Sequence, residues 1–171
     1  GVTSIGDYAF SNCKELSSIR FEASAVPLTI GFQSASDLAD QVGPFYQSPL
    51  TNIYVNRELV ASAAYATARD QKDEGIFSTP SNNRKVTVIL QGNVNTISDY
   101  MFSGVNMQTI WIPREVTSIG ESAFEGCISI KQISIPKGLY RDIDGKVYED
   151  FEAEKLFEAL GMEADWEKIR Y

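Results

Sequence analysis

Histidine is missing from this chain of 171 residues, and cysteine is scarce, with only Cys13 and Cys127. Without histidine there is no His-based general acid or base, no Ser-His-Asp triad and no His-ligated zinc. Two thiols are too few for a zinc site of their own or for a disulfide framework. Two carboxylates that meet in space, as in glycosidases, are the catalytic arrangement left open. The sequence therefore favours a non-enzymatic protein with no cofactor and no metal.

Basic residues are also few, because 15 Lys and Arg face 23 Asp and Glu, for a net charge of -8. Nucleic acid and anionic membranes bind through Lys and Arg, so both are poor partners for this chain. No apolar run approaches the ~18 residues that span a bilayer, which predicts no membrane insertion. Residue 1 is Gly and not Met, which is compatible with the earlier removal of an export signal.

A segment near the start of the chain returns near its end without gaps. Residues 2–21 read VTSIGDYAFSNCKELSSIRF, and residues 116–135 read VTSIGESAFEGCISIKQISI. A third copy, VNTISDYMFSGVNMQTIWIP at 94–113, starts 22 residues before the copy at Val116. Repetition at such a period is typical of a solenoid, in which each coil buries its apolar face against its neighbours.

Two looser copies lie between the first and the third. The stretch FYQSPLTNIYV at 45–55 repeats the apolar spacing of 102–112, and the run at 86–90 alternates as a strand does. Insertions at 33–43 and 61–75 add length, and the alanines of the second favour a short helix. We therefore expect a solenoid domain over residues 2–137, with about five coils: 2–25, 26–57, 58–93, 94–115 and 116–137.

Each coil has the same predicted course. Alternating apolar residues near its end form a short strand, as at Leu16, Ile19 and Phe21, and stacked coils then share a parallel sheet. The segments 7–10 and 121–124 are predicted to be one-turn helices or 3₁₀ turns that direct a phenylalanine into the core. Gly6 and Gly120 are expected to allow a tight bend. The phenylalanines are expected to form one ladder: Phe10, Phe45, Phe77, Phe102 and Phe124.

The pattern VTSIGxxAFxxCxxLxxIxIP resembles the BspA-like leucine-rich repeat, closely over residues 2–24 and 94–137 and loosely over 25–93. The resemblance and the spacing together predict an α/β fold. It is a right-handed leucine-rich-repeat solenoid with a parallel β-sheet on one face and short helical or 3₁₀ turns on the other. The resemblance also implies a bacterial protein that is secreted or attached to the cell surface and is associated with adhesion. The chain departs from the family in its short length and its two long insertions.

Residues between the inward positions of the strands face outward and are expected to stack in columns. One predicted column contains Arg20, Tyr54, Ile89, Trp111 and Ser134, and its neighbour contains Ser18, Asn52, Thr87, Thr109 and Gln132. Exposed aromatics on a rigid face are typical of binding hot spots. The candidate ligand-binding residues are therefore Arg20, Asn52, Tyr54, Ile89, Thr109 and Trp111. The alternatives are an ordinary sheet surface, or a stripe that the insertion loops cover.

Cys13 and Cys127 occupy the same repeat position in the first and fifth coils. At ~4.8 Å per coil they lie ~19 Å apart, far beyond the ~7 Å Cα limit of a disulfide. We expect both to be small buried core residues, the alternative being a reactive thiol.

Residues 138–171 depart from the repeat and are predicted to be a C-terminal cap. The stretch YRDIDGKVY at 140–148 indicates a hairpin about Asp144-Gly145. Residues 150–160 indicate an amphipathic helix, and 163–171 a second short one. The acidic residues here do not have the spacing of an EF-hand. A partner-binding helix is the alternative to a cap.

The first coil shows no such covering segment, so we expect apolar surface at that end. Together with the spacing, the resemblance implies a protein-binding or adhesion module, extracellular or at the cell surface, whose partner is an unknown protein such as a host extracellular protein. A glycan-binding module, indicated by Tyr54 and Trp111, and a passive spacer repeat are the alternatives.

Overall fold

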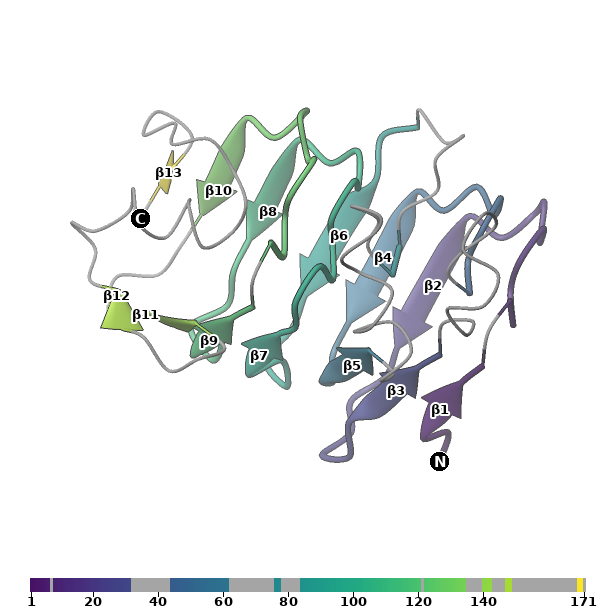
Figure 1. Cartoon of the computed structure of the whole chain (residues 1–171), viewed down its shortest axis with the longest axis horizontal. Coiled ribbons are helices and arrows are strands. Elements are labelled where there is room, and N and C mark those ends of the chain that lie inside the picture. Colours follow the sequence, from purple (N-terminus) through teal and green to yellow (C-terminus); the bar gives the residue numbers. More distant parts are fainter. Residues whose placement is uncertain are drawn as a thin grey trace.

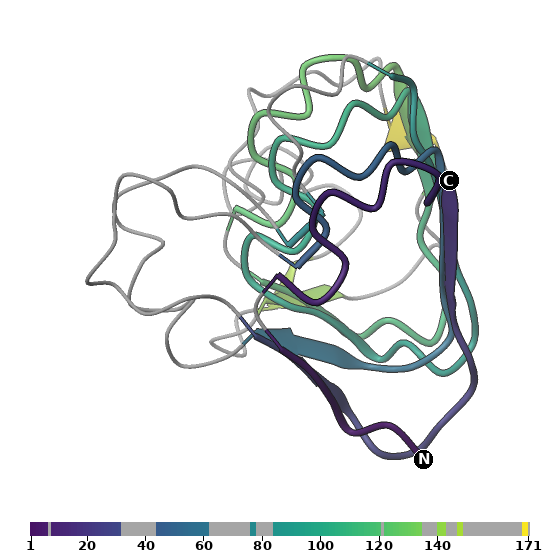
Figure 2. The same ribbon diagram turned by 90° about the vertical axis from the view of Figure 1, so that its right-hand side faces the viewer.

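The computed structural model describes residues 1–6, 8–31, 44–61, 76–77, 84–120, 122–134, 140–142, 147–148 and 169–170. Within these residues the chain is built of short strands and hydrogen-bonded turns. Successive coils lie one behind the next along the longest axis, which Figures 1 and 2 show from the side and from the end.

The strands that end the coils form the larger β-face of the molecule. They are β2 (Ser18–Phe21), β4 (Asn52–Val55), β6 (Thr87–Leu90), β8 (Thr109–Trp111) and β10 (Gln132–Ser134). Strands β2, β4 and β6 pair in parallel, as do β8 and β10, and β6 contacts β8, so the strands follow one another across one face (Figure 1). Each coil advances the chain by one strand, which is why all these pairs are parallel.

A second row of strands lies along the bottom of Figure 1. It contains β1 (Ser4–Ile5), β3 (Leu28–Ile30), β5 (Leu59–Ala61), β7 (Thr96–Ile97) and β9 (Ser118–Ile119). These strands pair in parallel as β1-β3-β5 and β7-β9. They correspond to the VTSIG segments, so each predicted coil contributes two strands and not one.

The core lies between the two rows of strands and the turns, and the predicted phenylalanine ladder runs through it. Each ring is nearly parallel to the next, with centroids 5.5, 5.4, 5.8 and 5.7 Å apart from the first coil to the fifth. The ladder is confirmed: Phe10, Phe45, Phe77, Phe102 and Phe124. All but Phe10 are buried.

The phenylalanines are carried by hydrogen-bonded turns, and no helix occurs among the described residues of these turns, so the predicted helical segments are not confirmed. Left-handed residues flank the turns at Phe10, Phe102 and Phe124, as at Tyr8 (φ 55°) and Asn12 (φ 57°) in the first coil. Such residues interrupt a right-handed helix. The amide of Phe10 donates to the carbonyl of Pro44 in the next coil at 2.9 Å, and that of Phe102 donates to Ala123. These amides are thus satisfied between coils and need no helix.

Both rows of strands continue beyond the fifth coil. Strand β11 (Tyr140–Asp142) pairs in parallel with β9 and antiparallel with β12 (Val147–Tyr148), and β13 (Ile169–Arg170) pairs in parallel with β10. Residues 169–170 are therefore in a strand, not in the predicted second helix. The predicted helix at 150–160 lies outside the described residues. That residues 138–171 form a cap stays a prediction.

Candidate functional site

The outward residues of the larger β-face stand in the columns that the spacing predicts. Arg20 lies opposite Tyr54, and Tyr54 lies opposite Ile89. Trp111 lies opposite Ser134 on the neighbouring pair of strands. Since β6 and β8 are adjacent, the two segments of this column follow one another across the face (Figure 1).

The apolar part of this column is held outward by the burial of its neighbours. Val88 and Leu90 flank Ile89 in β6, and both are buried. Ile110 and Ile112 flank Trp111 in the same way, and both are buried. Side chains alternate along a strand, so Ile89 and Trp111 must point to solvent. Their exposed fractions are 38% and 60%.

Tyr54 is less available than the sequence implied. It is half-buried, and the guanidinium carbon of Arg20 lies 4.2 Å from its ring centroid. This is cation–π geometry, in which the ring attracts the cation through its quadrupole. Arg20 occupies one face of the ring, so the free apolar surface of the column is concentrated at Ile89 and Trp111.

The second predicted column is polar and lies on the same face. Asn52 stands between Ser18 and Thr87, and Thr109 stands opposite Gln132. The side-chain amide of Asn52 donates to the Thr51 hydroxyl at 3.1 Å. All six candidate residues are thus on one surface: Arg20, Asn52, Tyr54, Ile89, Thr109 and Trp111. We call this surface the stripe face.

The two cysteines are free thiols in different surroundings. Cys127 is buried as expected, its thiol donates to the carbonyl of Phe102 at 3.0 Å, and burial raises its pKa to about 12. Cys13 is exposed, so the prediction of a buried residue is wrong there. The difference follows from stacking, because a preceding coil covers Cys127 and no described residue does so at Cys13.

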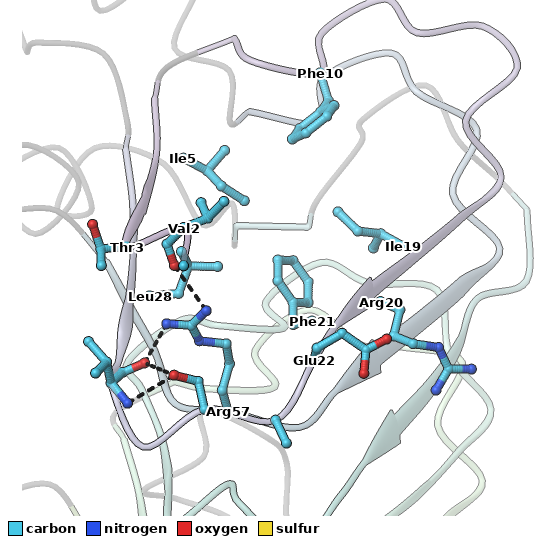
Figure 3. Close-up of a pocket in the computed structure, with 14 residues that line it drawn as sticks. Val2, Thr3, Ile5, Phe10, Ile19, Arg20, Phe21, Glu22, Leu28 and Arg57 are labelled. Carbon is cyan, nitrogen blue, oxygen red and sulfur yellow. Dashed lines mark hydrogen bonds between the residues drawn. The ribbon is translucent and has the colours of Figure 1, made fainter.

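A hollow lies at the end of the first coil, where the sequence predicted apolar surface but not its shape. It measures about 560 Å³ and is lined by apolar side chains, among them Ile5, Ile19 and Leu28 (Figure 3). The expected apolar surface at this end is therefore present. Arg57 was not foreseen, since nothing in its local sequence marks it as buried. It lies against the hollow, and its guanidinium donates to the carbonyls of Val2 and Val26.

Among the described residues there is no group of three or more His, Cys, Asp or Glu side chains placed to hold a metal ion. No helix within those residues is long and apolar enough to cross a membrane.

The family model for the BspA type leucine-rich repeat region matches residues 1–37 and 73–156, in six copies. These stretches make up more than half of the chain. The chain belongs to the BspA-type leucine-rich repeat family. Comparison with curated proteins and with solved structures gave no match. Leucine-rich repeats are generally non-enzymatic, and repeat modules of this class typically bind proteins.

Proposed function

We propose that this BspA-type chain is a protein-binding module that uses its stripe face, outside the cell or at the cell surface, in bacterial adhesion. The observation that carries the proposal is the 60% exposure of Trp111 on a strand whose inward neighbours are buried. A large aromatic held on a rigid surface loses little conformational entropy when a partner covers it. Ile89 extends the same apolar surface on the adjacent strand.

The distribution of polar and apolar residues on the stripe face favours a partner that covers the apolar residues at its centre. The two columns are polar around Ile89 and Trp111, and Arg20 is the charged member. An apolar centre with a polar rim is typical of protein interfaces. Replacing Trp111 at such a centre commonly costs at least ~2 kcal/mol, or about 30-fold in affinity.

The test is binding of the full chain to a panel of purified extracellular-matrix proteins, measured by surface plasmon resonance. Trp111→Ala is expected to weaken any binding about 30-fold while leaving the unfolding midpoint unchanged. The matched control is Ile128→Ser, because Ile128 is 94% exposed but lies in a turn and not on the stripe face. Equal losses in both variants would contradict the proposal.

A glycan-binding module is the second candidate, and the exposed indole of Trp111 favours it because sugar rings stack on aromatic faces. It predicts binding on a glycan array that Trp111→Ala abolishes. Tyr54→Ala would have a smaller effect, since Arg20 already lies over that ring. Silence on both the protein panel and the glycan array would indicate a passive spacer repeat.

A further inference from the structure

We propose that the stripe face binds an extended acidic segment of its partner protein. In this segment a carboxylate pairs with Arg20, and an apolar side chain four residues away covers Trp111. The proposal rests on the protein-binding function above and adds the chemistry of the bound segment. The charge of the face, the fixed position of the Arg20 guanidinium and its distance from Trp111 each favour such a segment.

The charge of the stripe face is opposite to that of the chain. Arg20 is the one charged residue of the two columns, whereas 23 Asp and Glu exceed 15 Lys and Arg over the whole chain. The exposed bases Lys85 and Lys131 lie just before β6 and β10, at one border of the face. The acid Glu22 follows β2 at the opposite border. The face is therefore complementary to an acidic partner, and such complementarity gives specificity.

The guanidinium of Arg20 is positioned on the face before any partner binds. Arg20 and Phe21 lie on opposite sides of β2 (Figure 3), and Phe21 is buried. The guanidinium carbon lies 4.2 Å from the centroid of the Tyr54 ring. The ring covers one side of the guanidinium, so N–H groups at its edge remain for a carboxylate, which they can bind as a planar fork. Because the ring already orders this side chain, less conformational entropy is lost on binding.

A single fixed guanidinium suits a carboxylate better than a polyanion. Polyanions bind through many bases along a surface, and the columns of the stripe face contain one. A protein segment also supplies an apolar side chain for Ile89 and Trp111, whose exposed fractions are 38% and 60%. The partner that satisfies both parts of the face is therefore a peptide chain with an acidic and an apolar residue.

The distance from Arg20 to Trp111 matches an extended segment. Strand β2 is followed by β4, β6 and β8 across the face, and adjacent strands are ~4.8 Å apart, so these two residues lie ~14 Å apart. An extended chain rises ~3.4 Å per residue, so residues i and i+4 lie on one side of it and ~14 Å apart. A segment that crosses the strands can thus direct an acid at i to Arg20 and an apolar side chain at i+4 to Trp111. The side chain at i+2 then lies over Tyr54 and Ile89.

The neighbouring polar column can satisfy the main chain of such a segment. Thr87 and Thr109 are exposed and Asn52 is half-buried, and their hydroxyl and amide groups both donate and accept hydrogen bonds. A peptide that leaves water for this face loses hydrogen bonds, and unreplaced ones are costly. A polar column beside the apolar one therefore favours a peptide over a purely apolar ligand.

The test uses the full chain and synthetic peptides. The peptide GSETVTFSG has Glu and Phe four residues apart, GSQTVTFSG replaces the acid by its neutral amide, and GSTEVTFSG shifts the acid by one residue. Binding is followed by NMR from the indole N–H signal of Trp111, which the variant Trp111→Phe assigns. We expect the first peptide to bind about fivefold more tightly than either of the others, as one exposed ion pair allows.

Two variants of the chain locate the charge preference. Arg20→Gln is expected to remove the difference between the Glu and Gln peptides and to leave the weaker binding at Trp111. The matched control is Lys14→Gln, which loses the same charge from an exposed turn residue of the first coil outside the stripe face. This control is expected to keep the fivefold difference, and both variants should unfold at the midpoint of the original chain.

Equal affinities of the original chain for the three peptides would overturn this inference. The proposed function would still stand if Trp111→Ala weakened binding in the protein panel, so the two failures are distinguishable. A difference that Lys14→Gln removes as fully as Arg20→Gln would also overturn the inference, because net charge and not Arg20 would then decide it. Heparin that binds more tightly than the Glu peptide, and loses this binding in Arg20→Gln, would assign the guanidinium to a polyanion instead.

Discussion

The position three residues after each ladder phenylalanine shows how a single side chain links two coils. Cys13, Ser48, Val105 and Cys127 occupy it in the first, second, fourth and fifth coils, and Pro80 follows Phe77 at the same distance in the sequence. Val105 fits this position because its side chain is small, although it has no hydrogen-bond donor. The hydrogen bonds of Ser48 and Cys127 to the preceding coil show that the position also serves as a donor to a buried carbonyl. A buried carbonyl without a partner costs about 1–3 kcal/mol, so a small donor stabilises the junction.

The Cys127 thiol makes the stability of the chain dependent on pH in the alkaline range. Burial raises its pKa to about 12 in the folded chain, from an ordinary value of 9.0. Above pH 9 the unfolded chain loses this proton while the folded chain keeps it, so the free energy of unfolding falls as pH rises. Below pH 9 both the folded and the unfolded chain keep this proton, so the free energy of unfolding does not depend on the thiol's ionisation there. At pH 10 the loss is expected to be about 1.4 kcal/mol.

Urea unfolding at pH 8 and pH 10 measures this effect, with Cys127→Ser as the reference. The variant lacks the thiol, so the decrease that it shows comes from all other groups. We expect the original chain to lose more stability between the two pH values than the variant does. Parallel pH profiles would show that Cys127 ionises as readily in the folded chain as in the unfolded one.

At the scale of the element, the turn around each phenylalanine is defined by its left-handed residues. They lie two residues before the ring, at Tyr8, Tyr100 and Ser122, and two after it, at Asn12, Gln47, Gly104 and Gly126. Only some of these are glycines, which is why the spacing of glycines did not reveal the turn. The sequence predicted a helical or 3₁₀ turn here. In the first coil the amides of Ala9 and Ser11 do bond within the turn, but that of Phe10 donates to the next coil.

The ladder gives the elements a common core, and its central members are expected to matter most. Phe102→Ala removes a fully buried ring that stacks on both sides, and should lower the free energy of unfolding by ~3–5 kcal/mol. Phe10→Ala removes a half-buried ring with one stacked neighbour, and should cost clearly less. Urea unfolding of the two variants makes the comparison. Equal costs would contradict a ladder whose contribution depends on two-sided burial.

At the scale of the whole molecule, a stack of coils is stabilised mainly by contacts between neighbours, so its stability varies along the axis. Strand β4 is paired on both sides, whereas β2 is an edge strand in which Ile19 is only half-buried. End coils of such stacks open first, because they lose only one interface when they do.

Hydrogen exchange tests this gradient. The amide of Thr51, which donates to Ser17, and those within β4 are expected to exchange more slowly than the amides of β2. The measurement is native-state exchange at neutral pH, followed by mass spectrometry of peptides covering each strand. Uniform protection across β2 and β4 would indicate that the described coils open as one unit.

The sequence by itself determined the phenylalanine ladder and the columns of the stripe face. The periodic apolar residues decide which side chains face inward, and the repeat then places equivalent residues opposite one another. Phe102 and Trp111 could be assigned to core and surface because this alternation is local.

The tertiary structure decided what depends on a neighbouring coil. Gly120 is needed for the close approach of Asp99, Arg20 covers Tyr54, and Arg57 donates to the distant carbonyl of Val2. These contacts join residues that lie 20 or more positions apart in the sequence. The two cysteines make the same point: they share one repeat position, yet Cys127 is buried and Cys13 exposed, because only Cys127 has a described coil stacked before it.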